Sequence, residues 1–134
     1  MSNTLKVTIA SQGKAPLEYE AESLITSSSN GKIQFGYNHA PIIISTIPTT
    51  TTVIVNGKRE EIFTSYGVVY IKNNEVKFCC DTAELSKDID KNRAESSKKR
   101  AEKRLQNPKD IDIERAKRSL ARANARIKTI SINH

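Results

Sequence analysis

The sequence is poor in the residues that form covalent cross-links and redox sites. Its 134 residues include only two cysteines, Cys79 and Cys80, and neighbouring cysteines seldom pair with each other. Without a further cysteine there is no disulfide framework, which favours a reducing, cytosolic compartment. We interpret both thiols as ordinary strand residues rather than as parts of a metal site or redox centre.

Long hydrophobic runs are also missing. Apolar runs such as residues 42–44 fall far short of the roughly 20 apolar residues that span a membrane. Residues 1–7 have no apolar core of a secretory signal. The sequence therefore predicts neither a spanning helix nor a cleaved signal, and it leaves open a peripheral place on a membrane complex.

Glycine and aromatic residues are absent from the second part of the chain. After Leu85 the composition changes to alanine, lysine, arginine and glutamate, which are good helix formers. The net charge of +7 is uneven, because residues 1–86 contain 7 basic and 8 acidic residues whereas residues 87–134 contain 15 and 7. The chain thus divides into a nearly neutral domain, 1–86, and a basic domain, 87–134. Such a basic segment attracts nucleic acid, anionic lipid, nucleotide or an acidic protein surface.

The first domain has the pattern of a protein built from β-strands. Short runs rich in β-branched residues alternate with turn signals, of which Asn30-Gly31 and Asn56-Gly57 are typical of hairpins. Strands of this length at regular spacing predict an antiparallel sandwich or barrel. The expected strands are residues 4–10, 17–25, 32–35, 42–47, 49–55, 59–65, 68–72 and 76–81.

The second domain is predicted to be an antiparallel pair of helices. Asp88 is the expected N-cap of a first helix that ends at Gln106, because Pro108 cannot extend it. Asp110 is the expected N-cap of a second helix that runs to about Ile130, and the short link predicts an antiparallel hairpin. The fold class is therefore α+β, an N-terminal antiparallel β-sandwich followed by a C-terminal antiparallel two-helix hairpin.

The predicted seam between the two helices is thin, because the stripe on the first helix consists mostly of small side chains. They allow close approach of the backbones but bury little apolar area, so the seam stabilises the hairpin only weakly. We therefore expect the hairpin to detach, extend or refold against a partner. The seam residues are Ile89, Ala94, Ser97, Ala101 and Leu105 on the first helix and Ile113, Ala116, Leu120, Ala123, Ile127 and Ile130 on the second.

The pattern Ile-Asp-x-x-Arg-Ala occurs twice, at residues 89–94 and 111–116. It places a carboxylate and a guanidinium three residues apart on one helical face, which suits the binding of an anion, an acidic partner or both. The same spacing is also that of an ordinary ion pair on an exposed helix, worth roughly a few tenths of a kcal/mol. For Asp112 and Arg115 of the second copy, we favour the ordinary ion pair.

Further short motifs follow one another along nearly the whole chain. They are Asn38-His39-Ala40-Pro41, Asp81-Thr82-Ala83-Glu84 leading into the first Ile-Asp-x-x-Arg-Ala copy, and the stretch from Arg100 to Leu105. In this order, behind a β-rich segment, they resemble the epsilon subunit of bacterial rotary F-type ATP synthases. The resemblance implies the same sandwich and helix pair.

The resemblance also implies a non-catalytic role in the central rotor stalk. In the family the sandwich binds the gamma subunit and the ring of c subunits. The helices move between a compact hairpin and an extended state, which contacts the alpha and beta subunits and inhibits ATP hydrolysis. The resemblance therefore implies a peripheral place on the cytoplasmic face of the cell membrane.

In some members of the family the compact hairpin binds ATP as a regulatory ligand, and no cofactor is required. Arginine offers planar, multidentate donors to phosphate, and Glu84 and Asp90 are expected as acceptors for the base or the sugar. No Walker-type glycine loop occurs, so the expected activity is ligand sensing without hydrolysis. The matching ATP-binding residues are Glu84, Ile89, Asp90, Arg93, Ala94, Arg100, Arg122 and Arg126.

Other residues are expected to dock onto partner subunits. His39 has no nucleophile or carboxylate pair beside it in the sequence, so we assign it to a subunit-facing loop. The remaining cations of the tail form a field that suits an acidic loop of the beta subunit. The docking residues predicted are His39, Lys98, Lys99, Lys103, Arg104, Arg115 and Arg118.

Three other classes of protein are less favoured. A nucleic-acid-binding hairpin is the main alternative, but the tail carries seven acidic residues and no aromatic residue to stack on bases. A helix on the membrane surface lacks Trp or Phe anchors. An enzyme is the least favoured class, because no catalytic constellation occurs in the sequence.

Overall fold

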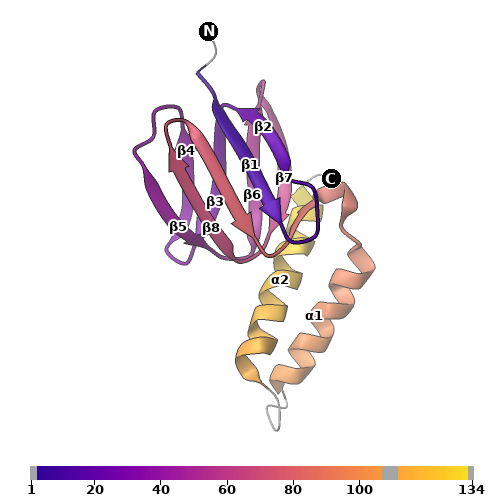
Figure 1. Cartoon of the computed structure of the whole chain (residues 1–134). Coiled ribbons are helices and arrows are strands. Elements are labelled where there is room, and N and C mark those ends of the chain that lie inside the picture. Colours follow the sequence, from indigo (N-terminus) through magenta and orange to yellow (C-terminus); the bar gives the residue numbers. More distant parts are fainter. Residues whose placement is uncertain (1–2, 107–111, 133–134) are drawn as a thin grey trace.

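The computed structural model describes residues 3–106 and 112–132, and Figure 1 shows a body of β-strands from which two helices project. The strands form two five-stranded sheets. The first sheet has the order β2 (Leu17–Ala21), β1 (Leu5–Ser11), β9 (Glu75–Cys80), β8 (Gly67–Lys72) and β5 (Ile42–Thr46). The second has the order β10 (Ala83–Leu85), β7 (Lys58–Thr64), β6 (Thr49–Val55), β3 (Ser23–Ser28) and β4 (Gly31–Gly36).

The core lies between the two sheets and follows from the alternation of apolar side chains along the strands. In β1, Leu5, Val7 and Ile9 are at most 1% exposed, while the residues between them face outward. Phe35 and Phe78 fill the same layer from opposite sheets. The strand pairs are antiparallel except for β1 and β9, which run parallel.

Two details of the sandwich differ from the sequence prediction. The single strand expected over residues 17–25 is wrong, because the chain leaves the first sheet after β2 and enters the second sheet as β3. Glu22 makes this corner, with its N–H donating to the carbonyl of Ile54 at 2.7 Å and its carboxylate accepting from the Gly57 N–H at 2.9 Å. The three-residue strand β10 was not predicted, because so short a run carries no periodicity.

The second domain is a pair of α-helices, α1 (Lys91–Gln106) and α2 (Ile113–Ile132), preceded by a 3₁₀ helix, η1 (Ser86–Asp88). The helices lie side by side and antiparallel (Figure 1). The predicted fold class, a sandwich followed by a two-helix hairpin, is confirmed. Within the described residues, no helix is long and apolar enough to cross a membrane.

The two copies of Ile-Asp-x-x-Arg-Ala mark the starts of the two helices. The Asp90 carboxylate accepts a hydrogen bond from the Arg93 N–H at 3.1 Å, and Asp112 accepts one from the Arg115 N–H at 3.2 Å. Each aspartate is therefore an N-cap. Asp88 as the predicted cap of the first helix is wrong, because it belongs to η1, and Asp110 lies outside the described residues.

Loss of the Asp90 cap is expected to destabilise the helical domain. Asp90→Ala leaves a backbone N–H of the first turn without its partner, and we expect the free energy of unfolding to fall by about 1 kcal/mol. Urea unfolding followed by circular dichroism at the helix band measures it. Asp88→Ala is the matched control, with an expected change of less than about 0.5 kcal/mol. Equal effects of the two substitutions would contradict the assignment of the cap.

The seam between the helices is lined by alanine. Ala94 and Ala101 of α1 and Ala116 and Ala123 of α2 are at most 3% exposed. Ile113 was predicted in the seam but is 41% exposed, because it begins α2 where little of α1 remains beside it. The seam is thus as thin as the sequence indicates.

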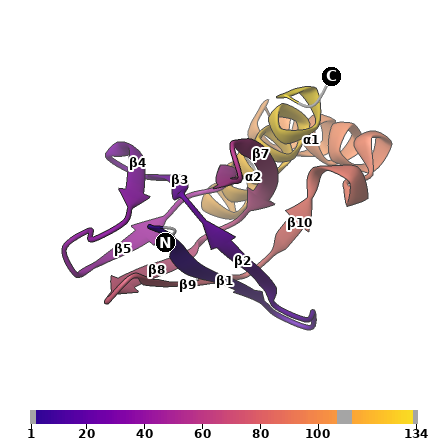
Figure 2. The ribbon, with the colours of Figure 1, turned by 90° about the horizontal axis from the view of Figure 1, so that it is seen from above.

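A second face of α2 packs on the outer face of the second sheet, over β6 and β7 (Figure 2). Ala125 and Thr129 are buried there, and the Thr129 and Thr50 hydroxyls are 2.7 Å apart. Neither Ala125 nor Thr129 was among the predicted seam residues, because the periodicity of one helix does not reveal contacts with a second partner. The C-terminal half of α2 consequently connects the hairpin to the sandwich.

Candidate functional site

Two clefts lie on the hairpin, one where it meets the sandwich and the other between its two helices. The first, with a volume of about 330 Å³, combines carboxylates with arginines, and we name it the carboxylate cleft. The second, of about 310 Å³, has four arginines and no acidic residue in its lining, and we name it the arginine cleft. The carboxylate cleft is lined by Glu84, Asp88, Ile89, Asp90, Arg93, Ala94, Ser97 and Arg126. The arginine cleft is lined by Ser97, Arg100, Ala101, Arg104, Ser119, Arg122 and Arg126.

Arg126 belongs to both clefts and also holds α2 against the sandwich. Its Nε donates to Oε1 of Glu84 at 2.7 Å, and its guanidinium carbon lies 4.6 Å from the centre of the Phe63 ring. Glu84 and Phe63 are register partners on β10 and β7. The Arg126 and Glu84 side chains are only 26% and 21% exposed, so water screens this pair less than a surface ion pair. Arg126 is therefore a structural anchor and, at the same time, a cation at the junction of the clefts.

Neighbouring contacts orient two more guanidinium groups. The Arg122 guanidinium carbon lies 5.5 Å from the centre of the Tyr66 ring, within the range of a cation–π interaction. Arg100 donates through Nη2 to the Ser97 hydroxyl at 3.1 Å. Arginines from both helices thus converge on the arginine cleft.

The two clefts differ in their electrostatics. Within the described part of the chain, Arg100, Arg104 and Arg122 form no ion pair, and Arg126 is paired with Glu84. The arginine cleft therefore carries uncompensated positive charge, whereas the carboxylate cleft contains hydrogen-bond acceptors beside two guanidinium groups. An elongated ligand with an anionic tail and a polar, uncharged head matches this division.

Two family models match nearly the whole chain. The model described as the ATP synthase, Delta/Epsilon chain, beta-sandwich domain matches residues 4–86, and that of the long alpha-helix domain of the same chain matches residues 87–131. The chain belongs to this family. The prediction of an epsilon-type rotor subunit of an ATP synthase is confirmed.

Relatives from clostridia resemble the chain over most of their length. The ATP synthase epsilon chain of Clostridium botulinum (strain Okra / Type B1) is 44% identical over 129 residues, which are 96% of this chain and 97% of the relative. That of Clostridium kluyveri (strain NBRC 12016) is 43% identical over 107 residues, covering 78% of this chain and 80% of the relative.

Solved structures share the fold at much lower identity. A chain of the Euglena gracilis mitochondrial ATP synthase, in a structure of OSCP, F1 and c-ring, superposes with a TM-score of 0.84 at 14% identity, covering 100% of this chain and 84% of that chain. A chain of the central stalk and c-ring of the Tetrahymena thermophila enzyme gives 0.59 at 10% identity, covering 96% and 95%.

The structure brings all eight residues predicted for ATP together at the two clefts of this epsilon-family chain. Glu84, Ile89, Asp90, Arg93 and Ala94 line the carboxylate cleft, Arg100 and Arg122 line the arginine cleft, and Arg126 lines both. Sequence reasoning missed Asp88, Ser97 and Ser119, and it did not place Arg104 at a cleft. A signal for Arg104 existed, because it follows Arg100 by one helical turn.

The ordinary ion pair, which was the alternative for Asp90 and Arg93 and the favoured interpretation for Asp112 and Arg115, is wrong for both copies. Among the described residues, the ion pairs are Arg59 with Glu61, Lys117 with Glu114, and Arg126 with Glu84. Asp90 bonds to the Arg93 backbone instead. The Arg93 guanidinium is thereby left to line the carboxylate cleft.

The residues predicted for docking do not form one cluster. Lys99, Lys103, Arg115 and Arg118 are exposed, and Lys98 is half-buried. His39 lies in the loop after β4, where its ring centre is 5.0 Å from that of Phe35 and its Nδ1 is 2.7 Å from the Ala40 carbonyl oxygen. Reciprocal bonds between Asn38 and Asn74 tie this loop to the β8–β9 turn, so the loop has a defined conformation.

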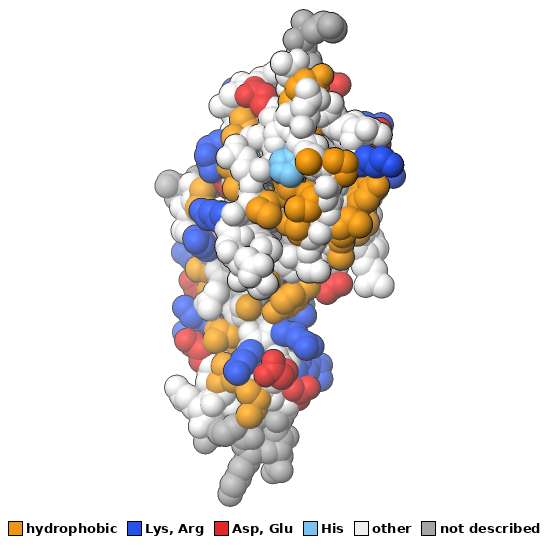
Figure 3. Space-filling view, turned by 90° about the vertical axis from the view of Figure 1, so that its left-hand side faces the viewer, with side chains coloured by type: hydrophobic (Ala, Val, Ile, Leu, Met, Phe, Trp, Pro, Cys, Tyr) orange, Lys and Arg blue, Asp and Glu red, His pale blue; other side chains and the backbone are white. Residues whose placement is uncertain are grey.

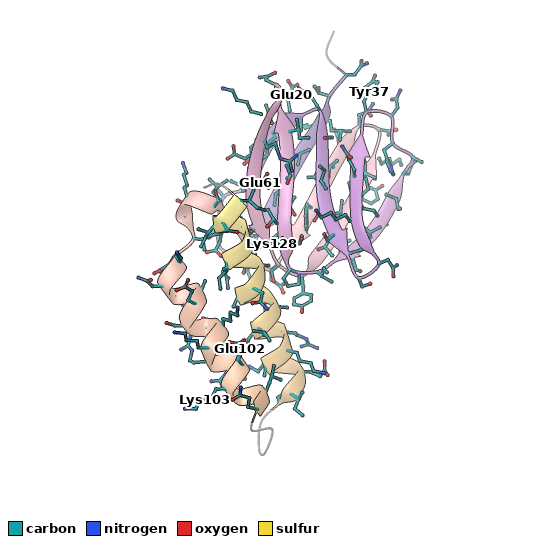
Figure 4. The ribbon with its side chains drawn as sticks, turned by 180° about the vertical axis from the view of Figure 1, so that it is seen from behind. Glu20, Tyr37, Glu61, Glu102, Lys103 and Lys128 are labelled. Carbon is teal, nitrogen blue, oxygen red and sulfur yellow. The ribbon has the colours of Figure 1, made fainter. Side chains whose placement is uncertain are left out.

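A larger hollow of about 410 Å³ lies on the outer face of the second sheet beside the end of α2, near Glu61 and Lys128 (Figure 4). None of the eight residues predicted for ATP lines it. The buried Glu61 carboxylate is already satisfied by the Thr52 hydroxyl at 2.7 Å and by Arg59 at 3.1 Å. The hollow's other basic residues are Lys32 and Lys128, so it lacks the converging arginines of the two clefts.

Proposed function

We propose that this rotor subunit is a brake on ATP hydrolysis whose hairpin moves and whose compact state is favoured by ATP. The sandwich binds the gamma subunit and the c-ring, and the extended helices contact the alpha and beta subunits. Through these partners the chain lies peripherally at the cytoplasmic face of the cell membrane. The observation that carries the proposal is the position of Arg126, which both anchors the hairpin and lines the two clefts.

The attachment of the hairpin supports its mobility. Among the described residues, the polar and ring contacts that fix α2 to the sandwich are few: the Arg126–Glu84 pair, the Arg126–Phe63 and Arg122–Tyr66 contacts, and the Thr129–Thr50 hydroxyl pair. An alanine seam adds little apolar burial between α1 and α2. Segments with few buried apolar contacts open at a small free-energy cost, which a partner surface readily offsets.

The clefts support the binding of a nucleoside triphosphate. The acceptors Glu84 and Asp90 suit the amino group of the base or the hydroxyls of the sugar, and the arginine cleft suits the phosphates. A ligand that touches both helices and β10 binds only the compact state, so it shifts the population toward that state.

Titration of ATP into the isolated chain tests this site. We expect saturable binding with a dissociation constant below about 1 mM, since several charge-assisted hydrogen bonds each contribute about 1.5 kcal/mol or more. Isothermal calorimetry measures the affinity, and sulfate at the same ionic strength is the control for unspecific anion binding. Absence of saturation at millimolar ATP would end the ATP-sensing part of the proposal.

The outer face of the first sheet supports docking of the gamma subunit. Ile43 on β5 and Tyr70 on β8 are register partners and are 65% and 38% exposed. Val68, two residues from Tyr70, is 44% exposed and pairs with the exposed Cys79. Figure 3, which views the molecule from the side of β5, shows apolar side chains gathered on the sandwich. An apolar patch of this kind on a chain from a multisubunit complex fits an interface.

The two cysteines provide a test of that docking surface. Burial raises the pKa of the Cys80 thiol to about 11, so it stays protonated and unreactive at neutral pH. Cys79 is exposed, and a maleimide is expected to label it alone in the free chain. In the assembled enzyme, labelling of Cys79 should slow by about tenfold or more, since the partner excludes the reagent. Cys79→Ser is the control, and equal rates in both states would place the interface elsewhere.

The family assignment removes the reason for the nucleic-acid alternative. The arginines on which it depended converge on the hairpin's own clefts, and Arg122 and Arg126 also contact aromatic rings of the sandwich region. They are thus not arranged along one open face that could follow a phosphate backbone.

A further inference from the structure

The hollow of about 410 Å³ on the outer face of the second sheet, which we name the sheet hollow, is separate from the two clefts of the hairpin. Lys128 and Ile132 of α2 form its wall beside the sheet (Figure 4). The sheet hollow therefore needs both the sheet and the docked end of α2, and it exists only while the hairpin is compact. Its floor is one row of register partners across four strands: Gln34 of β4, Ile25 of β3, Thr52 of β6 and Glu61 of β7.

The neutral polar groups of the sheet hollow already have partners within the chain. The Thr52 hydroxyl donates to the Glu61 carboxylate at 2.7 Å, and the Thr49 hydroxyl donates to the Ser27 hydroxyl at 3.1 Å. These donors are engaged, so a ligand in the sheet hollow is recognised mainly by its charged residues.

Three cations reach the sheet hollow from three different elements, namely Lys32 of β4, Arg59 of β7 and Lys128 of α2. The Glu61 carboxylate, whose side chain is 2% exposed, accepts from Nε of Arg59 at 3.1 Å and offsets its charge. Among the described residues, Glu61 is the only acid in the lining, and neither Lys32 nor Lys128 forms a hydrogen bond or an ion pair. The two ammonium groups are therefore the uncompensated charges of the sheet hollow.

The two lysines lie on opposite sides of an apolar surface. Lys32 is on β4, two strand spacings or about 10 Å from β6, over which α2 packs with Lys128. Ile25 on β3 lies between these strands, and Ile132, which is 46% exposed, follows Lys128 by one turn of α2. Cations on two sides of an apolar surface suit a ligand that has an anionic group at each end and an apolar body.

We propose that the sheet hollow binds a small organic dianion with an apolar body, of the class of aliphatic dicarboxylates. The two carboxylates pair with Lys32 and Lys128, Arg59 offers its remaining N–H groups, and the chain covers Ile25 and Ile132. Such a ligand touches the sheet and α2 together, so it favours the compact hairpin without using any residue predicted for ATP. This regulatory consequence rests on the proposed mobility of the hairpin, whereas the binding site itself does not.

Calorimetric titration of suberate into the full chain tests the site at about 0.15 M salt, where distant surface charges are screened. The two carboxylates of suberate lie about two strand spacings apart when its chain is extended, and we expect saturable binding. Octanoate has the same chain with one carboxylate, and succinate has the same charge on a shorter chain. Each should bind at least about fivefold more weakly than suberate. Absence of saturation at millimolar suberate, or equal binding of suberate and octanoate, overturns the dianion site.

Substitution of the two lysines locates the ligand. Lys32→Gln and Lys128→Gln are each expected to weaken suberate binding about fivefold, because each removes one charge-assisted hydrogen bond. Lys6→Gln is the matched control, because it removes the same charge from an exposed position of β1 in the other sheet and should cost less than about twofold. Circular dichroism checks that each variant keeps its fold. Losses no larger than that of Lys6→Gln overturn the site.

Arg100→Gln distinguishes the sheet hollow from the arginine cleft. Arg100 lines the arginine cleft and not the sheet hollow, so this variant should change the affinity for suberate by less than about twofold. A loss of suberate binding as large as that of Lys128→Gln would place the dianion in the arginine cleft and overturn the proposal.

Hydrogen exchange in the C-terminal half of α2 measures the consequence for the hairpin. Suberate at ten times its dissociation constant should slow this exchange about tenfold, because it binds only while α2 is docked. In the assembled enzyme it should then relieve inhibition of ATP hydrolysis. Suberate that binds without slowing the exchange overturns the bridging of α2 and the sheet. Slower exchange with an unchanged rate of hydrolysis leaves the site standing and contradicts the mobile brake of the proposed function.

Discussion

Removal of residues 87–134 is expected to raise the rate of ATP hydrolysis by the assembled ATP synthase about two- to tenfold. In the proposed function the brake acts through the hairpin. If the extended state leaves only a fraction of the enzyme active, removal of the hairpin raises the rate by the inverse of that fraction. The sandwich keeps its docking surfaces in this truncation, because Ile43, Val68 and Tyr70 lie on the sheet that α2 does not cover. The ATPase rate of purified complexes with equal subunit content measures the effect.

A reversible lock separates loss of the hairpin from loss of its motion. The Thr50 and Thr129 hydroxyls are 2.7 Å apart across the interface of α2 with β6, so cysteines at both positions bring two sulfur atoms near each other for an engineered disulfide. With Cys79→Ser to remove the exposed thiol, the oxidised double variant should hydrolyse ATP as fast as the truncation. Reduction should restore inhibition.

Each outcome of these two experiments has a distinct meaning. A truncation that leaves the rate unchanged shows that the hairpin does not inhibit. A lock whose oxidation changes nothing, in an enzyme that the truncation does accelerate, shows that inhibition does not need the hairpin to leave the sandwich. The mobile brake requires that both variants raise the rate and that only the lock responds to reductant.

The sandwich could be predicted from sequence because its strands obey a period of two. Leu5, Val7 and Ile9 alternate with outward residues, and the Asn-Gly turns separate strands as expected. The corner at Glu22 could not be predicted, since the apolar alternation continues through it while the chain changes sheets. That change depends on the partners of Glu22 on the β6–β7 hairpin, which are more than 30 residues away in sequence.

The repeated hexapeptide was interpreted as an anion site or an ion pair, but in the structure both copies also begin a helix. Asp90 and Asp112 cap helices, and Ile89 and Ala94 occupy the positions of a hydrophobic staple around the first cap. The spacing that the two copies share is therefore explained by helix initiation alone. What distinguishes the first copy is its surroundings, because only there do Glu84 and Arg126 complete a cleft.

The candidate site was predictable where one helix supplied the pattern and unpredictable where two elements meet. Arg93 and Arg100 share a face of α1 by their spacing, and both line the clefts. The contacts of Arg126 with Phe63 and of Arg122 with Tyr66 depend on how α2 crosses β7. The sequence pattern of a single segment does not reveal how two segments cross.

Arg126→Gln is expected to weaken ATP binding at least about tenfold. It removes a guanidinium that lines both clefts, and with it a charge-assisted hydrogen bond to phosphate. Arg118→Gln is the matched control, because it removes the same charge from an exposed position of α2 outside the clefts and should cost less than about twofold. Calorimetric titration of the isolated chain gives both affinities.

Glu84→Gln separates the anchor from the ligand contact. It breaks the 2.7 Å ion pair, leaves the Arg126 guanidinium for phosphate, and keeps an amide oxygen at position 84 as an acceptor for the ligand. Glu84→Gln and Arg126→Gln should both speed hydrogen exchange in the C-terminal half of α2. The expected factor corresponds to a loss of about 1 kcal/mol in the free energy of local opening. Arg126→Gln binding ATP as tightly as Arg118→Gln would show that the nucleotide does not use these clefts.

In the assembled enzyme, Arg126→Gln should strengthen inhibition for two additive reasons. The compact state loses the anchor to Glu84 and Phe63, and it also loses the stabilisation that ATP supplies. A ligand at ten times its dissociation constant stabilises the state it binds by about 1.4 kcal/mol, and a tenfold weaker affinity removes about 1 kcal/mol of this. Glu84→Gln removes mainly the anchor. Raising the ATP concentration should therefore still relieve inhibition of the enzyme that carries Glu84→Gln, whereas inhibition of the enzyme that carries Arg126→Gln should change little over the same range.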